Sequence, residues 1–182
     1  MKTHFVLDTY KDELAQADFK RFYFDNPSLT TQAPNSYLNV SDYSYLKSIH
    51  SKYPFFNTEI SLFCVEGNKS LANKWPIHID AGRRSALNIP IVNCGIHSTT
   101  SFYDQPNPFR NRLEPIPQYQ IAMVHGDLKL IDEFSLTSPT IIDTSIPHSV
   151  INNGSGYRVI MSWGSMLSFN ELINLLISRR QA

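Results

Sequence analysis

The sequence predicts a mainly β protein, a sandwich or barrel flanked by helices near both ends of the chain. From residue 57 onward, short runs of β-branched and aromatic residues alternate with turn signals such as Glu66-Gly67-Asn68, Gly126-Asp127 and Asn153-Gly154-Ser155-Gly156. Many short strands at this spacing are typical of a sandwich or barrel. Apolar residues at helical spacing occur before residue 57 and again after residue 165.

Length and composition predict one globular domain. The chain has 182 residues, 42% of them hydrophobic and 18% charged, and Lys+Arg and Asp+Glu both number 16. This length can enclose a sizeable core, and the balanced charge gives no support for a nucleic-acid or membrane partner recruited by bulk charge. We expect a single domain over 1–182, with a helical buttress over 1–56, a β core over 57–164 and a C-terminal helix over 165–182.

The cysteine count and the N-terminal sequence predict a cytoplasmic protein. Cys64 and Cys94 are the two cysteines, and reduced core thiols are a simpler interpretation than a disulfide framework. Charged residues interrupt the first residues too early for a signal peptide, and no apolar run is long enough to span a bilayer. The sequence leaves monomer and homodimer equally open.

The elements are predicted in chain order from local patterns. Residues 3–8 predict a strand, 11–22 a helix and 26–39 a loop, and Ser41 could be the N-cap of a second helix. Ser168, with Glu171 three residues later, predicts the capping box of the last helix. Further strands are expected at 58–65, 75–80, 86–94, 99–103, 119–125, 128–134, 140–143, 148–152 and 157–164.

The first candidates for a functional site are His78 and Asp80, in the strand expected at 75–80. Side chains at i and i+2 of a strand point to the same face, so this imidazole and this carboxylate would project together. His148, at the start of a later strand, offers a second imidazole. Two histidines and one carboxylate form the facial triad that suits non-heme Fe(II) and leaves coordination positions open.

Arg158 lies in an otherwise apolar strand, ten residues after His148. The turn at 152–156 predicts that the strands carrying these two residues are antiparallel neighbours, which would bring both side chains into one cavity. A guanidinium suits a bidentate carboxylate ligand. An exposed strand position, or an internal ion pair with Asp or Glu, explains Arg158 equally well.

The order His78-x-Asp80, His148 and Arg158 resembles that of the Fe(II)/2-oxoglutarate-dependent oxygenases. The nearest groups are the aspartyl/asparaginyl hydroxylase-like and small prolyl-hydroxylase-like proteins, and the resemblance covers about residues 57–164. It implies a double-stranded β-helix core, a jelly-roll of the cupin kind. It also implies that His78, Asp80 and His148 bind Fe(II) and act in catalysis, while Arg158 binds the distal carboxylate of 2-oxoglutarate.

Three more residues are candidates for the co-substrate pocket that this resemblance implies. They are Asn88, Tyr103 and Ser162. Asn88 could hydrogen-bond the co-substrate or orient a ligand, and a structural role is as good an interpretation. A basic residue near the first ligands can contact substrate or co-substrate in this family, and the sequence offers Arg83 and Arg84 without choosing between them.

We therefore expect a dioxygenase that uses Fe(II), 2-oxoglutarate and O2 to hydroxylate a small molecule or an amino-acid side chain, free or in a peptide. One alternative is a cupin-type metal enzyme without 2-oxoglutarate, either an isomerase or an O2-only dioxygenase. Another is a non-catalytic jelly-roll domain that binds a ligand. Arg158 distinguishes the first from the second, and metal binding distinguishes both from the third.

Overall fold

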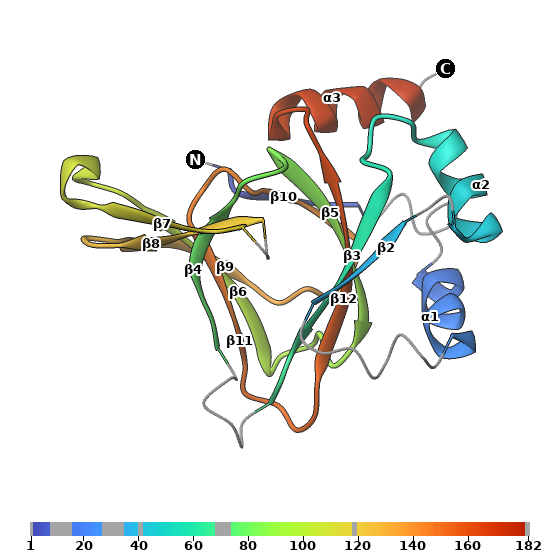
Figure 1. Cartoon of the computed structure of the whole chain (residues 1–182), viewed down its shortest axis with the longest axis horizontal. Helices are drawn as coiled ribbons and strands as arrows, with labels where there is room; N and C mark the ends of the chain where they lie inside the picture. The colour runs from blue at the N-terminus through green and yellow to red at the C-terminus, as the bar shows by residue number, and fades with distance from the viewer. Residues whose placement is uncertain are drawn as a thin grey trace.

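Two six-stranded antiparallel sheets form a β-sandwich in the computed structural model of the chain (Figure 1). The structure describes residues 2–7, 16–26, 35–39, 42–67, 74–117 and 120–180. None of the helices within these ranges is long and apolar enough to cross a membrane.

The first sheet, sheet A, joins strands from the beginning, middle and end of the chain. In spatial order it contains β1 (His4–Val6), β10 (Thr140–Asp143), β5 (Ser85–Val92), β12 (Arg158–Ser165), β3 (Glu59–Val65) and β2 (Asn35–Asn39). Sheet B contains β7 (Arg112–Ile116), β8 (Ile121–His125), β4 (Lys74–Asp80), β11 (His148–Asn152), β6 (Ser98–Asp104) and β9 (Lys129–Phe134).

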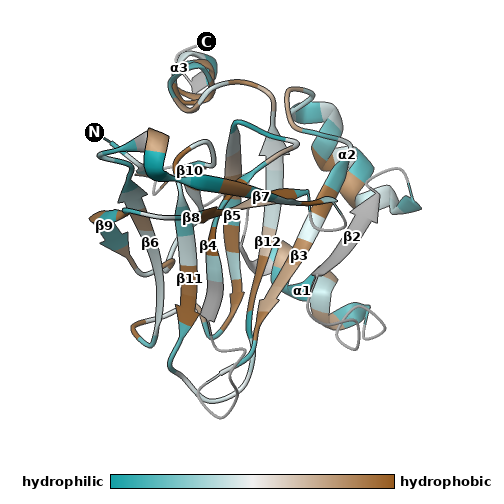
Figure 2. Cartoon of the chain, turned by 60° about the vertical axis from the view of Figure 1, so that its left-hand side comes forward, coloured by the Kyte–Doolittle hydropathy of each residue, from teal (hydrophilic) through white to brown (hydrophobic). Residues whose placement is uncertain are grey.

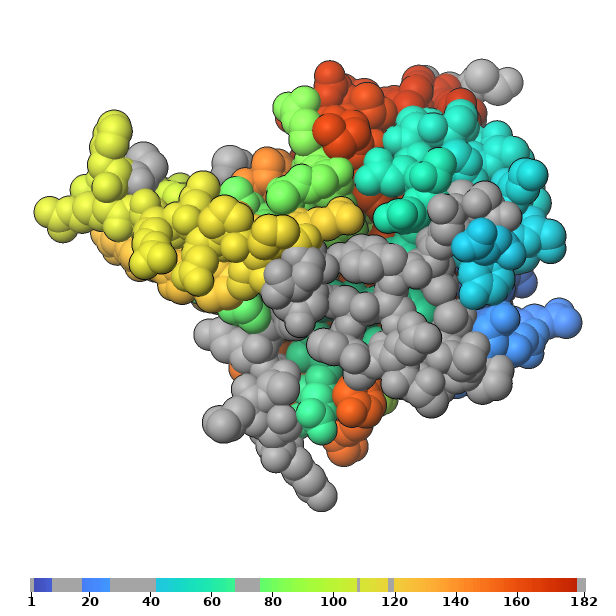
Figure 3. Space-filling model, viewed as in Figure 1, coloured from blue at the N-terminus to red at the C-terminus, as the bar shows by residue number. Residues whose placement is uncertain are grey.

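The central strands follow a regular pairing scheme. Two arms of the chain, β3 to β6 and β9 to β12, run antiparallel, so that β6 pairs with β9, β5 with β10, β4 with β11 and β3 with β12. Within each arm, successive strands alternate between the two sheets. The β7–β8 ribbon lies between the arms in sequence and projects from the body of the protein (Figures 1 and 3).

The largest hydrophobic core lies outside the sandwich, between sheet A and the helices. Strand residues such as Leu87 and Met161 pack there with Phe19, Leu46 and Leu172 from the helices. The helices are α1 (Gln16–Asp25), α2 (Ser44–Lys52) and α3 (Phe169–Arg180), which lie along this side of the sandwich in Figure 1.

The space between the sheets is more polar than this outer core. Its apolar residues form two small clusters, one around Phe102 and Ile142 and one around Leu136 and Ile160. Figure 2 shows polar and apolar stretches along β5 and β11. Strand alternation sends the large apolar residues of β5 and β12 toward the helices, and their polar residues, Asn88 and Ser162, therefore face the sandwich interior.

The N-terminal third differs from its sequence prediction in two ways. The segment expected to be a loop contains β2, so the helical buttress expected over 1–56 also supplies an edge strand of sheet A. The strand expected at 3–8 is confirmed as β1. The second helix begins at Ser44 with Tyr43 in the N-cap position and without a capping side chain. Ser41, the expected N-cap, and residues 11–15 of the first predicted helix lie outside the described residues.

Two further predictions concern the C-terminal half. No strand was expected between residues 103 and 119, but this segment contains β7, which is paired with β8. The capping box of the last helix is confirmed, because Ser168 Oγ and its backbone N–H both donate to Glu171 Oε2, at 2.6 and 2.7 Å.

Candidate metal centre

His78 and His148 lie directly opposite each other on adjacent strands of sheet B. Cα pairing joins His148 of β11 to His78 of β4, and the two ring centroids are 4.3 Å apart. Both side chains are buried. The register shifts by one residue just beyond this pair, where β4 carries Pro76. Proline cannot donate a ladder hydrogen bond and is tolerated at such a bulge.

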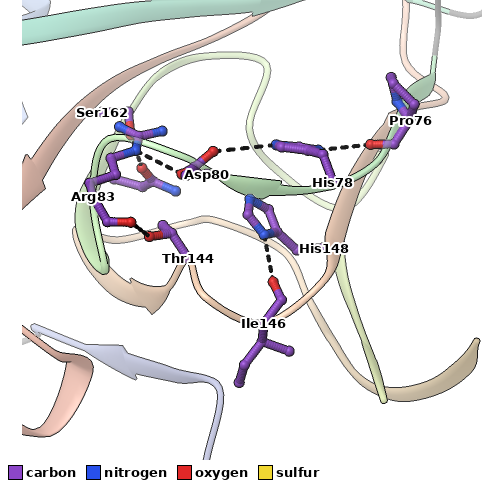
Figure 4. A network of polar contacts seen from close by, with 9 residues as sticks. Pro76, His78, Asp80, Arg83, Thr144, Ile146, His148 and Ser162 are labelled. Carbon is purple, nitrogen blue, oxygen red and sulfur yellow. Dashed lines mark hydrogen bonds and ion pairs between the residues drawn. The ribbon is translucent and has the colours of Figure 1, made fainter. Parts of the chain in front are cut away.

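Backbone carbonyls fix the orientation of both imidazoles. His78 Nδ1 lies 2.8 Å from the Pro76 carbonyl oxygen, and His148 Nδ1 lies 2.9 Å from that of Ile146 (Figure 4). A carbonyl oxygen only accepts, so each Nδ1 carries a proton, and in a neutral imidazole the lone pair then lies on Nε2. This is the tautomer that a metal-binding histidine needs when its other nitrogen is tied to the protein.

Asp80 completes the group and is itself held by an arginine. Its Oδ1 lies 3.6 Å from His78 Nε2, and its Oδ2 accepts a 2.7 Å hydrogen bond from Arg83 Nε. The Asp80 side chain is only 3% exposed. Oδ1 is therefore the carboxylate oxygen that faces the histidines.

The electrostatics keep His78 and Asp80 in their metal-binding protonation states. Burial, and then the neighbouring His148, lower the pKa of His78 to about 3. Burial alone would raise the pKa of Asp80, but Arg83 and the two imidazoles outweigh it and the net shift is downward. At neutral pH the centre therefore offers a neutral imidazole at His78 and an ionised carboxylate at Asp80.

The three residues can hold a metal ion. One ligand atom from each lies within 4.8 Å of the other two. Metal–nitrogen bonds of about 2.1 Å would bring adjacent ligand atoms to roughly 3 Å, so binding requires only a small contraction. The donors are of the kind that iron, zinc and related metals accept.

Arg158 reaches the same cavity from the opposite sheet. The cavity is narrow, about 30 Å³, and is lined by His78 and His148 on one side and by Arg158 and Ile160 on the other. β11 and β12 belong to different sheets. The prediction that they are hydrogen-bonded neighbours is therefore wrong, because the turn between them crosses the sandwich instead of closing a hairpin within one sheet.

The Arg158 side chain is buried without an ion-pair partner among the described residues. It is 1% exposed, and its Nε and Nη1 have no hydrogen-bond partner in the described part of the chain. Its Nη2 lies 3.4 Å from Thr100 Oγ1. Burial lowers the pKa of this guanidinium. A buried cation whose donors have no partner among the described residues is energetically costly, and an anion would satisfy it.

Asn88 and Ser162 line this cavity, as expected, and Tyr103 does not. Ser162 Oγ donates to Asn88 Oδ1 at 2.6 Å. Tyr103 instead bonds Ser149 at 3.1 Å, and both neighbour inward-facing residues of their strands. Strand alternation therefore places Tyr103 on the outer face of sheet B, and its assignment to the co-substrate pocket is wrong.

The structure also separates the two arginines after Asp80. Arg83 lines the cavity, whereas Arg84 is 60% exposed and lies 4.0 Å from Glu171. The sequence did not predict the hydrogen bond that Arg83 donates to Asp80, or the contact of Thr100 with Arg158. Strand alternation from residue 98 to 104 could have indicated Thr100. The hydrogen bond between Arg83 and Asp80 depends on the shape of the turn between them, which no local sequence pattern determines.

Together these features define a β-sandwich protein with a candidate metal centre and a buried cation in one cavity. A scan against models of known protein families matches none of them, and a search of curated proteins also gives no match. The site geometry therefore carries the functional argument.

Proposed function

We propose that the protein is an Fe(II)- and 2-oxoglutarate-dependent oxygenase that hydroxylates a small molecule or an amino-acid side chain. The observation that carries this proposal is Arg158, a buried guanidinium whose Nε and Nη1 have no partner among the described residues. It lines the same cavity as His78 and His148, which form the candidate metal-binding group with Asp80. A metal centre alone fits many reactions. A metal centre facing a buried cation that is unpaired among the described residues favours a ligand that chelates at one end and carries a carboxylate at the other.

The strand pairing supports a jelly-roll core of the double-stranded β-helix kind. Two antiparallel arms that pair strand by strand, while each alternates between sheets, describe a long hairpin rolled into a sandwich. This arrangement brings β4 and β11 together at the centre of one sheet. It places β12 across the interior from them.

Each residue of the cavity then has a role in binding or orientation. His78 and His148 would hold the metal through Nε2, and Asp80 through Oδ1. Arg158 would pair with the distal carboxylate of 2-oxoglutarate, and Asn88 and Ser162 would line the space between. When bound, Fe(II), 2-oxoglutarate and O2 would supply the oxidising chemistry. The enclosing strands would keep water from it.

A cupin-type metal enzyme without 2-oxoglutarate is the second candidate. Two histidines and a carboxylate also serve catalytic zinc, so the donor set by itself does not select the first proposal. Such an enzyme would have no use for the two Arg158 nitrogens that lack a partner in the described part of the chain. The third candidate is a non-catalytic ligand-binding sandwich. It would not explain why backbone carbonyls hold Nδ1 of both histidines and leave Nε2 to face the cavity group.

Calorimetric titration of 2-oxoglutarate into the Mn(II)-loaded protein tests the proposal without turnover. The wild-type chain should bind 2-oxoglutarate only when metal is present. Arg158→Met should weaken that binding by on the order of 2–5 kcal/mol while Mn(II) affinity is retained, because a buried charge-assisted pair is lost. The exposed Arg112 on β7 provides a matched control, Arg112→Met, which should bind as the wild type does. Metal binding without 2-oxoglutarate binding would favour the second candidate.

A further inference from the structure

Arg83 occupies a prepared position between the two sheets. Its Nε donates to Asp80 Oδ2 at 2.7 Å, and its Nη1 donates to Ser162 Oγ at 2.9 Å (Figure 4). Ser162 Oγ in turn donates a hydrogen bond to Asn88 Oδ1 at 2.6 Å. The metal-ligand candidate on β4 is thereby tied to β12 and β5, at the centre of sheet A.

Gly164 makes room for this arginine. A Cβ at position 164 would lie 2.6 Å from Arg83 Cδ, which is closer than carbon atoms approach without displacement, and 3.2 Å from Arg83 Cβ, which is a tight contact. Because Gly164 has no side chain, β12 leaves the space that the aliphatic part of the Arg83 side chain occupies.

The backbone around Arg83 is fixed as well. Thr144 Oγ1 donates to the Arg83 carbonyl oxygen at 3.1 Å, and the backbone N–H of Arg84 donates to the Ser165 carbonyl oxygen at 2.9 Å. Contacts at the guanidinium, the stem and the main chain all hold the side chain in one orientation. Such a side chain is pre-organised for a task.

We propose that Arg83 is a positioning residue that presents Asp80 to the metal through one oxygen. Arg83 occupies Oδ2, which leaves Oδ1 on the side of His78 and prevents the carboxylate from turning both oxygens toward the centre. Partners that orient a ligand in this way typically contribute 10- to 100-fold in metal affinity or activity. This inference rests on the metal-binding part of the proposed function and does not depend on 2-oxoglutarate.

Arg84 is the natural control for Arg83. It is the next residue, carries the same charge and is 60% exposed, with Glu171 at 4.0 Å. Replacing either arginine by methionine removes one positive charge from the same turn. A difference between the two variants therefore measures position and not net charge.

Co(II) titration of the metal-free full-length chain, followed by its visible absorption, is the test. Arg84→Met should match the wild type within about twofold. Arg83→Met should bind Co(II) roughly 10- to 100-fold more weakly and with a changed spectrum, since the geometry of Asp80 is released. Arg83→Lys should recover part of the affinity, and Gly164→Ala, which displaces Arg83 without removing it, should weaken binding too.

The outcomes separate this inference from the metal site itself. Wild-type affinity and spectrum in folded Arg83→Met would overturn the role of Arg83 while leaving the metal site intact. Equal losses in Arg83→Met and Arg84→Met would also overturn it, because they would indicate a charge effect. Absence of Co(II) binding in the wild-type chain would overturn the metal site and this inference with it.

Discussion

At the scale of single residues, the site is built at the expense of stability. Arg158 is buried with two nitrogens unpaired among the described residues, and His78 is buried in its neutral form. Neither arrangement helps the chain to fold. Under the proposed function, an anion would compensate Arg158 and a metal cation would bind His78.

Replacing Arg158 by methionine should therefore stabilise the ligand-free protein. Removing an unpaired buried charge and filling its space with an apolar side chain is expected to raise the free energy of unfolding by about 1–4 kcal/mol. Urea denaturation of both proteins without metal or dicarboxylate measures this. A lower stability in Arg158→Met would indicate that a partner compensates the guanidinium and would contradict the proposed anion site.

Acid should destabilise the metal-free protein through His78. The unfolded state takes up this proton near pH 6.5 and the folded state only near pH 3, so the unfolded state binds more protons between these values. Stability should fall as the pH decreases below 6.5, by about 1.4 kcal/mol per unit from this group. Asp80, whose pKa is lowered, stays ionised over most of that range.

Denaturation of the wild type and of His78→Asn between pH 7.5 and pH 5 isolates this effect. The difference between their free energies of unfolding should shrink, or reverse in favour of the variant, as the pH falls. A constant difference across the range would contradict the burial of a neutral His78.

At the scale of elements, the crossing between β11 and β12 determines where Arg158 points. Asn152 is fully buried, and its Nδ2 donates to the carbonyl oxygens of Val65 and Gly156, both at 2.9 Å. Its Oδ1 accepts from the backbone N–H of Gly154 at 3.1 Å. One side chain thus joins the turn to the end of β3.

Asn152→Ala should cost about 2–4 kcal/mol of unfolding free energy, because it leaves buried backbone groups without partners. The neighbouring Asn153 is exposed, and Asn153→Ala should stay within about 0.5 kcal/mol of the wild type. Thermal and urea denaturation provide the comparison. Similar small effects for both variants would show that the turn is held mainly by its backbone.

The elements also show how far local sequence patterns reach. The strands around His78, His148 and Arg158 are predictable because alternation and turn residues are local signals. The sheet to which each strand belongs is not local, so the 152–156 turn was assigned to a hairpin although it crosses the sandwich. β2 and β7 were missed for a related reason, since both are edge strands whose pairing partners, β3 and β8, define them.

The site residues also divide into those that local sequence patterns predict and those that depend on distant parts of the chain. The pairing of His78 with Asp80 follows from an i, i+2 spacing, and the sequence predicts it. Tyr103 was misplaced because alternation tells which residues share a face but not which face is inside. Arg83 could not be chosen over Arg84 from the sequence, because the choice depends on Gly164 of a distant strand.

At the scale of the whole molecule, stability and function are spatially separated. The largest core packs sheet A against the helices, while the metal-ligand group, Arg158 and their cavity occupy the space between the sheets. Substitutions of the cavity residues should therefore leave the outer core intact. This separation makes single-residue tests of the site interpretable.

The most direct test of the central claim is the anaerobic addition of 2-oxoglutarate to the Fe(II)-loaded protein, followed by visible absorption. We expect a weak metal-to-ligand charge-transfer band in the wild type. The band should be absent from His78→Ala and His148→Ala. An iron-loaded, folded wild-type protein that shows no such band at saturating 2-oxoglutarate would contradict the account.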